Sequence, residues 1–390
     1  MTTSGFDFYK LDDHLTGQQR RLRVRLRAYV EEVVWPNINP YWERGEFPRE
    51  IFMRLKELPV IGGMLQGYGC AGLDPLSSGL VSYELSRGDG SIVTIYGVHS
   101  GLAMGSIGLL GSEAQRERWL PAMARLEKIG AFGLTEPLRG SDASHVLTQA
   151  RRDGDSYILN GAKRWIGNAS IADLIIIWAR DQDGAFGGFV LENPQEIEGL
   201  TIEDIQGKIT KRAVLNANIT LENVQVPQEN RLAGCRSFRD TAKVLAYTRY
   251  SVAWGAAGLA AGCFELALKY AQEREQFGRP IAGFQLIQQK LVEMAAELTQ
   301  MQLLCFQLAR LMESGQMSDG AVSLAKYNNA LKARRVAQLA REIMGGNGVL
   351  IDHHVARLFT DAEAVYTYEG TNEINMLVAG REITGLNAIV

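Results

Sequence analysis

Residues 157–166 read YILNGAKRWI and mark a β-rich centre in an otherwise helical sequence. The Asn160-Gly161 pair suits a type I′ turn, so this stretch predicts a β-hairpin. The apolar run 174–178 predicts a buried strand, and Asp183-Gly184 leads into its expected partner at 188–191. We therefore expect a middle β domain, a barrel or a sandwich, over residues 131–236.

Helical patterns lie on both sides of this β domain. Thr16 is a predicted N-cap, and Ser112 with Gln115 forms a capping-box pattern, so residues 1–130 predict an N-terminal helical domain. After the β domain, apolar residues recur every seven positions from Phe284 to Cys305, a spacing typical of helices packed in a bundle. Residues 237–390 thus predict a C-terminal four-helix bundle, and the chain as a whole an α+β fold.

Composition excludes several classes of protein. The net charge is −3 over 390 residues, which favours neither nucleic acid nor an anionic membrane as partner. The apolar run 98–110 is too short for a membrane span and predicts a buried helix. The four cysteines are far apart and have no metal-ligand spacing, so we expect no metal site. Free thiols and an N-terminus without a targeting pattern lead us to expect a cytoplasmic protein.

Four segments have the residue types of a reactive site. They read FGLTEPLRGSD at 132–142, KRWIGN at 163–168, REQFGRP at 274–280 with FQLIQ at 284–288, and GGNG at 345–348 with YEGT at 368–371. In this order they resemble the acyl-CoA dehydrogenase family, over about residues 40–388. Within that family the chain is most similar to glutaryl-CoA dehydrogenases and short-chain acyl-CoA oxidases.

The resemblance implies an FAD enzyme that removes two hydrogens from an acyl-CoA thioester. Glu369 matches the family's base, which takes the α-proton while flavin N5 accepts a hydride from the β-carbon. A carboxylate facing a flavin and an acyl chain should lose hydration, which raises its pKa. Some relatives carry the base on the long helix corresponding to 242–262, but no Asp or Glu occurs there in this sequence.

The resemblance also assigns the residues around the base. It implies cofactor contacts from Phe132, Leu134, Thr135, Trp165, Ile166, Gly167, Arg274, Phe277, Gln285, Gly345, Gly346 and Thr371. It implies substrate contacts from Ser141, Arg249 and Gly370, with Val93 and Tyr368 as candidate lining of the acyl pocket. Trp165 could instead be a core aromatic, Arg274 a solvated helix-end charge and Arg249 half of a structural ion pair.

The chain departs from its relatives at two of these positions. Val93 stands where glutaryl-CoA dehydrogenases place the Arg that holds the far carboxylate, so we expect a short or branched acyl group without one. Gly167 stands where many relatives have a hydroxyl that donates to flavin N5.

The partners follow from the resemblance as well. It implies an electron-transfer flavoprotein as electron acceptor, with O2 as the alternative of an acyl-CoA oxidase. It also implies a homotetramer, a dimer of dimers, and a flavin held partly by a neighbouring subunit would require at least a dimer. A non-catalytic binding protein and a flavin monooxygenase or nitroalkane oxidase are further alternatives. The intact Glu369 and Arg274 disfavour the binding protein, and the unchanged motif from Tyr368 to Thr371 disfavours the other two.

Overall fold

The N-terminal part of the chain is helical, as predicted. The computed structural model describes residues 7–388. Thr16 accepts a hydrogen bond from the backbone of Gln19, and Ser112 pairs with Gln115 in the same way, which confirms both predicted caps. The helices are α1 (Gly17–Tyr29), α2 (Ile38–Arg44), α3 (Arg49–Met53), α4 (Pro75–Gly88), α5 (Gly90–Tyr96), α6 (Met104–Leu110) and α7 (Glu113–Ala124), with the π-helical segment η4 (Gly97–Ala103) joining α5 to α6.

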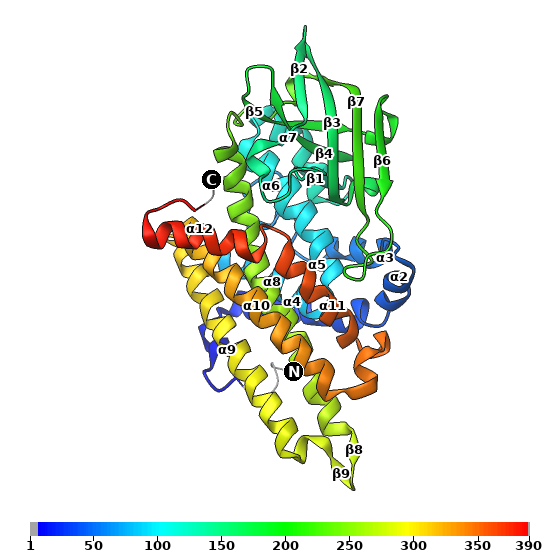
Figure 1. Ribbon diagram of the computed structural model, residues 1–390, viewed down its shortest axis with the longest axis vertical. Coiled ribbons are helices and arrows are strands. Elements are labelled where there is room, and N and C mark those ends of the chain that lie inside the picture. Colours follow the sequence, from blue (N-terminus) through cyan, green and yellow to red (C-terminus); the bar gives the residue numbers. More distant parts are fainter. Residues whose placement is uncertain (1–6, 389–390) are drawn as a thin grey trace.

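The middle of the chain forms one curled sheet at one end of the elongated molecule (Figure 1). Its strand order is β1-β4-β2-β3-β7-β6, with β5 paired to β4. β4 and β5 are antiparallel partners, as the sequence predicts, and the predicted barrel or sandwich takes the form of this single sheet. The strands are β1 (Gly130–Gly133), β2 (Gln149–Asp153), β3 (Ser156–Gly167), β4 (Leu174–Asp181), β5 (Phe186–Glu192), β6 (Leu200–Asp204) and β7 (Asn216–Pro227).

The prediction of a hairpin at Asn160-Gly161 is wrong. The chain runs straight through this pair inside β3, and a register shift against β7 occurs there instead of a turn. The Asn160 side chain accepts a hydrogen bond from the backbone N–H of Asn223 on β7, 2.8 Å away. Gly161 has a φ of 152°, and a Cβ there would lie 2.8 Å from the backbone of Thr148. Close approach of a neighbour, not a turn, requires this glycine.

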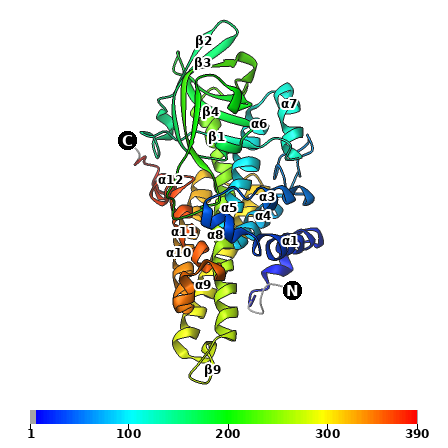
Figure 2. The same ribbon diagram turned by 90° about the vertical axis from the view of Figure 1, so that its right-hand side faces the viewer.

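The C-terminal part is a bundle of long helices that extends away from the sheet (Figures 1 and 2). α11 packs on α8 and α10, and α12 packs on α10. The small ribbon of β8 (Glu275–Gln276) and β9 (Arg279–Pro280) lies at the far tip, opposite the sheet. The helices are α8 (Phe238–Glu273), α9 (Gln285–Glu313), α10 (Asp319–Ile343), α11 (Val355–Thr367) and α12 (Asn372–Thr384).

Helix α8 crosses α4 so closely that backbone meets backbone. A Cβ at Gly258 would lie 2.0 Å from the carbonyl oxygen of Tyr83, and one at Gly262 would lie 2.3 Å from that of Arg87. By length and composition, Phe238–Glu273 and Gly90–Leu110 are apolar enough to cross a membrane. However, 72% and 61% of their most apolar windows are buried inside the protein, as expected of core helices.

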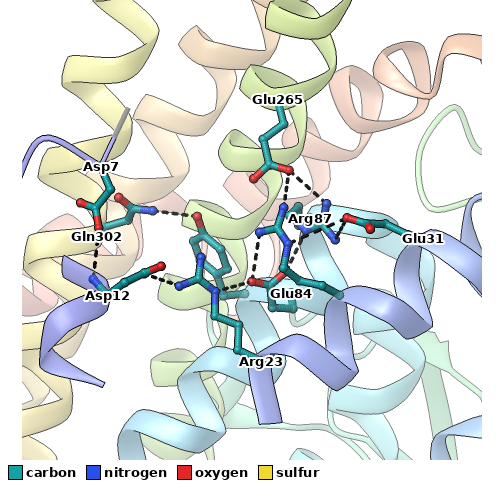
Figure 3. Close-up of polar contacts among 10 residues, drawn as sticks. Asp7, Asp12, Arg23, Glu31, Glu84, Arg87, Glu265 and Gln302 are labelled. Atoms are coloured by element: carbon teal, nitrogen blue, oxygen red, sulfur yellow. Dashed lines mark hydrogen bonds and ion pairs between the residues drawn. The ribbon is translucent and has the colours of Figure 1, made fainter. Parts of the chain in front are cut away.

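A buried ion network ties α1, α4 and α8 together (Figure 3). Glu84 is fully buried and accepts from Arg87 Nε at 2.7 Å and from Arg23 Nε at 2.9 Å. Glu265 on α8 pairs with Arg87 at 3.1 Å and with Arg27 at 2.7 Å. The positive arginines keep the pKa of Glu84 below its usual value despite the burial that would raise it. The network fixes the N-terminal helices against the helix that runs under the candidate site.

Candidate functional site

Glu369 lies on the tight turn between α11 and α12. Its φ is 55° and that of Gly370 is 79°, so a non-glycine residue is held in the left-handed region. Two side chains pin this turn. Lys326 Nζ on α10 donates to the carbonyl oxygens of Tyr366 at 3.1 Å and Gly370 at 2.9 Å. Asn375 Nδ2 donates to the same Gly370 oxygen at 2.8 Å, and Thr371 caps α12. The strained conformation of Glu369 is therefore fixed by contacts on both sides.

The Glu369 carboxylate faces α8. Thr248 Oγ1 donates to Glu369 Oε2 over 2.8 Å. Burial raises the pKa of Glu369, and three groups oppose that rise: the Thr248 hydroxyl, the Arg249 guanidinium and the Lys326 ammonium. A carboxylate with a raised pKa is a stronger base when ionised, which suits removal of a weakly acidic proton.

Arg249 stands beside this carboxylate without forming an ion pair. Its Nη1 donates to Ser323 Oγ at 3.3 Å, whereas its buried Nε has no hydrogen-bond partner among the described residues. Burial lowers the pKa of Arg249, and Glu369 counteracts this through its negative charge. An unsatisfied guanidinium N–H at a site of this kind is available to a ligand.

Trp165 lies at the end of β3 and is 50% exposed, so it is not a core aromatic. Its φ is 64°, and its carbonyl oxygen accepts from Asn216 Nδ2 at 3.2 Å, which fixes the turned backbone. The neighbouring Ile166 and Gly167 are buried. A Cβ at Gly167 would lie 3.2 Å from a Val98 methyl, so this strand end touches η4.

The segment that follows β1 lies next to the same strand. Phe132 and Leu134 are both buried. Phe132 packs on Trp178 with ring centroids 5.5 Å apart. The Thr135 carbonyl oxygen accepts from the Arg164 backbone at 2.8 Å. The structure thus brings together the predicted segments around Phe132 and Trp165.

A second group of predicted residues lies at the opposite tip of the chain (Figure 1). Arg274, Phe277 and Gln285 are exposed around the β8–β9 ribbon, with Phe277 94% exposed. Gly345 and Gly346 are also exposed. They lie near this ribbon, because the adjacent Asn347 donates to the Tyr270 hydroxyl near the end of α8 at 3.1 Å. Within one chain, this group remains separate from Trp165 and Glu369. Ser141 is exposed on the loop between β1 and β2, whereas Val93 and Tyr368 are partly buried.

Comparisons with known proteins decide the family. Models described as the N-terminal, middle and C-terminal domains of acyl-CoA dehydrogenase match residues 16–127, 131–224 and 238–384. The chain belongs to the acyl-CoA dehydrogenase family. It is therefore an FAD-dependent oxidoreductase that acts on acyl-CoA, and the α+β fold is that of the family.

Individual members of the acyl-CoA dehydrogenase family resemble the chain over nearly its whole length. The 3-(aryl)acrylate reductase of Clostridium sporogenes is 36% identical, covering 93% of this chain and 97% of its own. A crystal structure of glutaryl-CoA dehydrogenase from Mycobacterium smegmatis is 40% identical, with a TM-score of 0.94 and coverage of 97% and 98%. Another, in complex with FADH2, is 35% identical, with a TM-score of 0.95 and coverage of 99% of each chain.

The residues of this chain fit FAD. Trp165 presents a half-exposed indole at the end of β3, a flat apolar surface of the kind that a flavin ring needs. At the far tip, a Cβ on Gly345 or Gly346 would meet no atom within 4 Å, so the backbone there is open to a ligand. Arg274 beside it has the forked donor that suits a pyrophosphate.

Sequence reasoning missed three polar side chains that hold the base: Thr248, Lys326 and Asn375. Lys326 is fully buried, yet in the sequence it is one of two lysines on a long amphipathic helix. Thr248 gives a better signal, because it precedes Arg249 in an Ala- and Gly-rich helix where polar residues are few.

Proposed function

We propose that this acyl-CoA dehydrogenase oxidises a short-chain or branched acyl-CoA to the 2-enoyl-CoA, with Glu369 as the base. The observation that carries the proposal is the Glu369 carboxylate, pinned on a strained turn and hydrogen-bonded to Thr248 at 2.8 Å. FAD, when bound, supplies the acceptor for the hydride that leaves the β-carbon. A positioned general base typically contributes about 10²–10⁴-fold to the rate.

The residues around Glu369 control the transfer of one proton. The ionised carboxylate takes the α-proton, and its raised pKa favours keeping that proton once taken. Thr248, Arg249 and Lys326 stabilise the ionised form, so that enough of it exists before the reaction. Lys326 and Asn375 hold the backbone of the turn, which limits how far the carboxylate can move from the α-carbon.

The acyl group in this proposal has no far carboxylate. Val93 provides no charge at the position where the resemblance places an Arg in glutaryl-CoA dehydrogenases. We also propose that the flavin is held across a subunit interface in a homotetramer. The separation of Arg274 and Phe277 from Trp165 within one chain supports this, because a second copy could bring the two groups together.

An electron-transfer flavoprotein is the proposed acceptor of the electrons, as the family resemblance implies. Gly167 favours O2 as the second candidate, since its lack of a hydroxyl is shared with short-chain acyl-CoA oxidases. Reduction of the flavin by acyl-CoA, followed by admission of air, separates the two. Rapid reoxidation with formation of peroxide identifies an oxidase.

The test is the absorbance spectrum of the purified protein with butyryl-CoA in the absence of oxygen. We expect the yellow flavin to bleach, and the Glu369→Gln variant to keep its flavin and stay yellow. Glu373→Gln is the matched control, because Glu373 is exposed on α12 and only four residues away. A Glu369→Gln protein that bleaches as fast as wild type would remove Glu369 from the role of base. Wild-type protein that no straight, branched or aryl acyl-CoA bleaches would contradict the proposed function.

A further inference from the structure

Lys211 is a buried cation that neither the ion network nor the base requires. It lies on the loop between β6 and β7, and only 5% of the residue is exposed. Its Nζ donates to the carbonyl oxygen of Gly90 at 2.8 Å and to Thr94 Oγ1 at 2.9 Å, both on α5. Its φ is 43°, so the backbone is strained as well. Burial of a charge and backbone strain both cost stability, and together they indicate a functional position.

The side of α5 and η4 that Lys211 touches is open. Val93, Thr94, Gly97 and Val98 are all only partly buried, and a Cβ added at Gly97 would meet no atom within 4 Å. We call these four residues the open strip. Because a side chain would fit at Gly97 without displacing anything, a ligand chain can lie along the open strip.

The open strip leads from Lys211 to the base. One helical turn beyond it, a Cβ at Gly101 would lie 3.1 Å from the Thr248 methyl, and Thr248 holds Glu369. At its other end, Lys211 Nζ lies 5.0 Å from the centre of the Tyr368 ring, next to Glu369 in sequence. Thr94 and Gly101 are about 10 Å apart at the rise of an α-helix. An acyl chain whose α-carbon lies at Glu369 can therefore extend along the strip towards Lys211.

Lys211 retains a free donor there. An ammonium has three N–H groups, and among residues 7–388 only the two oxygens of α5 accept hydrogen bonds from it. No carboxylate of these residues lies within 4.0 Å of Nζ. Two acids lie farther away: Asp361, which accepts from the Lys211 backbone N–H, and Asp89, which is already paired with Arg357. Lys208, which also interacts with Asp361 through its charge, is a third cation in this region. Because the acyl group of the proposed function has no far carboxylate, the oxygen that Lys211 would meet is a neutral one.

We propose that Lys211 is a specificity residue that binds a neutral oxygen, a hydroxyl or keto group, at the far end of the acyl chain. This inference rests on the proposed function and narrows its substrate to short acyl groups oxygenated away from the thioester. Tyr368 and Thr94 orient the ammonium, and the oxygen of the acyl chain accepts its third N–H. A purely hydrocarbon chain would leave that donor unpaired, which a buried site disfavours.

Binding is measured with the Glu369→Gln protein, so that chemistry does not interfere. Spectral titration compares valeryl-CoA with 5-hydroxyvaleryl-CoA, and hexanoyl-CoA with 6-hydroxyhexanoyl-CoA. In at least one pair we expect the hydroxylated thioester to bind about tenfold more tightly, the effect of one good hydrogen bond to a charged donor. Adding Lys211→Met should abolish this preference, so that the hydroxylated and plain thioesters of each pair bind equally. Thr94→Val should weaken the preference, and Lys243→Met, on exposed α8 surface, should leave it unchanged.

The outcomes separate this inference from the proposed function. Hydroxylated and plain thioesters that bind equally in both pairs, or a preference that survives Lys211→Met, would overturn the role of Lys211. Glutaryl-CoA that binds more tightly than 5-hydroxyvaleryl-CoA, in a Lys211-dependent way, would overturn the neutral character of the group. Flavin content checks that Lys211→Met protein is folded. Bleaching of wild-type protein by plain valeryl-CoA tests the proposed function independently of either result.

Discussion

Replacing Thr248 by Val tests how the structure tunes the base. The substitution keeps the shape of the side chain and removes the hydroxyl that donates to Glu369 Oε2 at 2.8 Å. Hydrogen bonds to charged groups contribute about 1.5–3 kcal/mol, and one pKa unit corresponds to about 1.4 kcal/mol. Because the bond stabilises the ionised carboxylate, its loss should raise the pKa of Glu369 further, by about one to two units.

The assay is the rate of anaerobic flavin reduction by butyryl-CoA as a function of pH. A base must be ionised to act, so the rate rises with pH through the pKa of Glu369, and in Thr248→Val this acid limb should shift to higher pH. Thr241→Val is the control. Thr241 is buried on the same helix, and no hydrogen bond joins its hydroxyl to Glu369. An acid limb that stays in place in Thr248→Val, or moves equally in the control, would refute the reasoning.

Three further predictions concern the base turn and the core. Lys326→Met should also raise the pKa of Glu369, because the positive charge of Lys326 stabilises the ionised carboxylate. It should lower kcat more than it raises KM, because Lys326 holds the turn that carries the base. Kinetics over a pH series measure both effects. Glu84→Gln should lower Tm by roughly 4–6 °C at pH 7, because Arg23, Arg27 and Arg87 lose the carboxylate that they share. The lowered pKa of Glu84 means that its stabilisation is present above the ordinary carboxyl range and is lost as pH falls through the folded-state pKa, so thermal melts in acid should show a smaller difference. Gly258→Ala should lower the free energy of unfolding by about 1–3 kcal/mol or more, because its Cβ would lie 2.0 Å from a backbone oxygen of α4. Gly380→Ala is the control and should not destabilise the protein, because a Cβ there would meet no atom within 4 Å. Urea unfolding measures both variants.

Local signals in the sequence were reliable where the physics is local. A cap depends on residues three apart, and both predicted caps at Thr16 and Ser112 are present. The predictions of β4 and β5 depend only on short continuous apolar runs, and these strands pair as expected. The prediction of a turn at Asn160-Gly161 failed because this dipeptide suits two structures. It is favoured in type I′ turns, and its glycine is equally suited to an irregular position within a strand. Only the approach of Thr148 and the pairing with Asn223 decide between a turn and an irregular strand.

The sequence by itself determined the order of helical and β regions, the family resemblance and Glu369 as the candidate base. Each of these depends on short motifs or on periodicity within one element. Only the tertiary structure decided what surrounds the base. Thr248 and Glu369 are 121 residues apart, and Lys211 and Thr94 are 117 apart. Such contacts depend on how α5, α8, α10 and the β6–β7 loop pack against one another, and that packing arises from the whole core, so no local pattern encodes it.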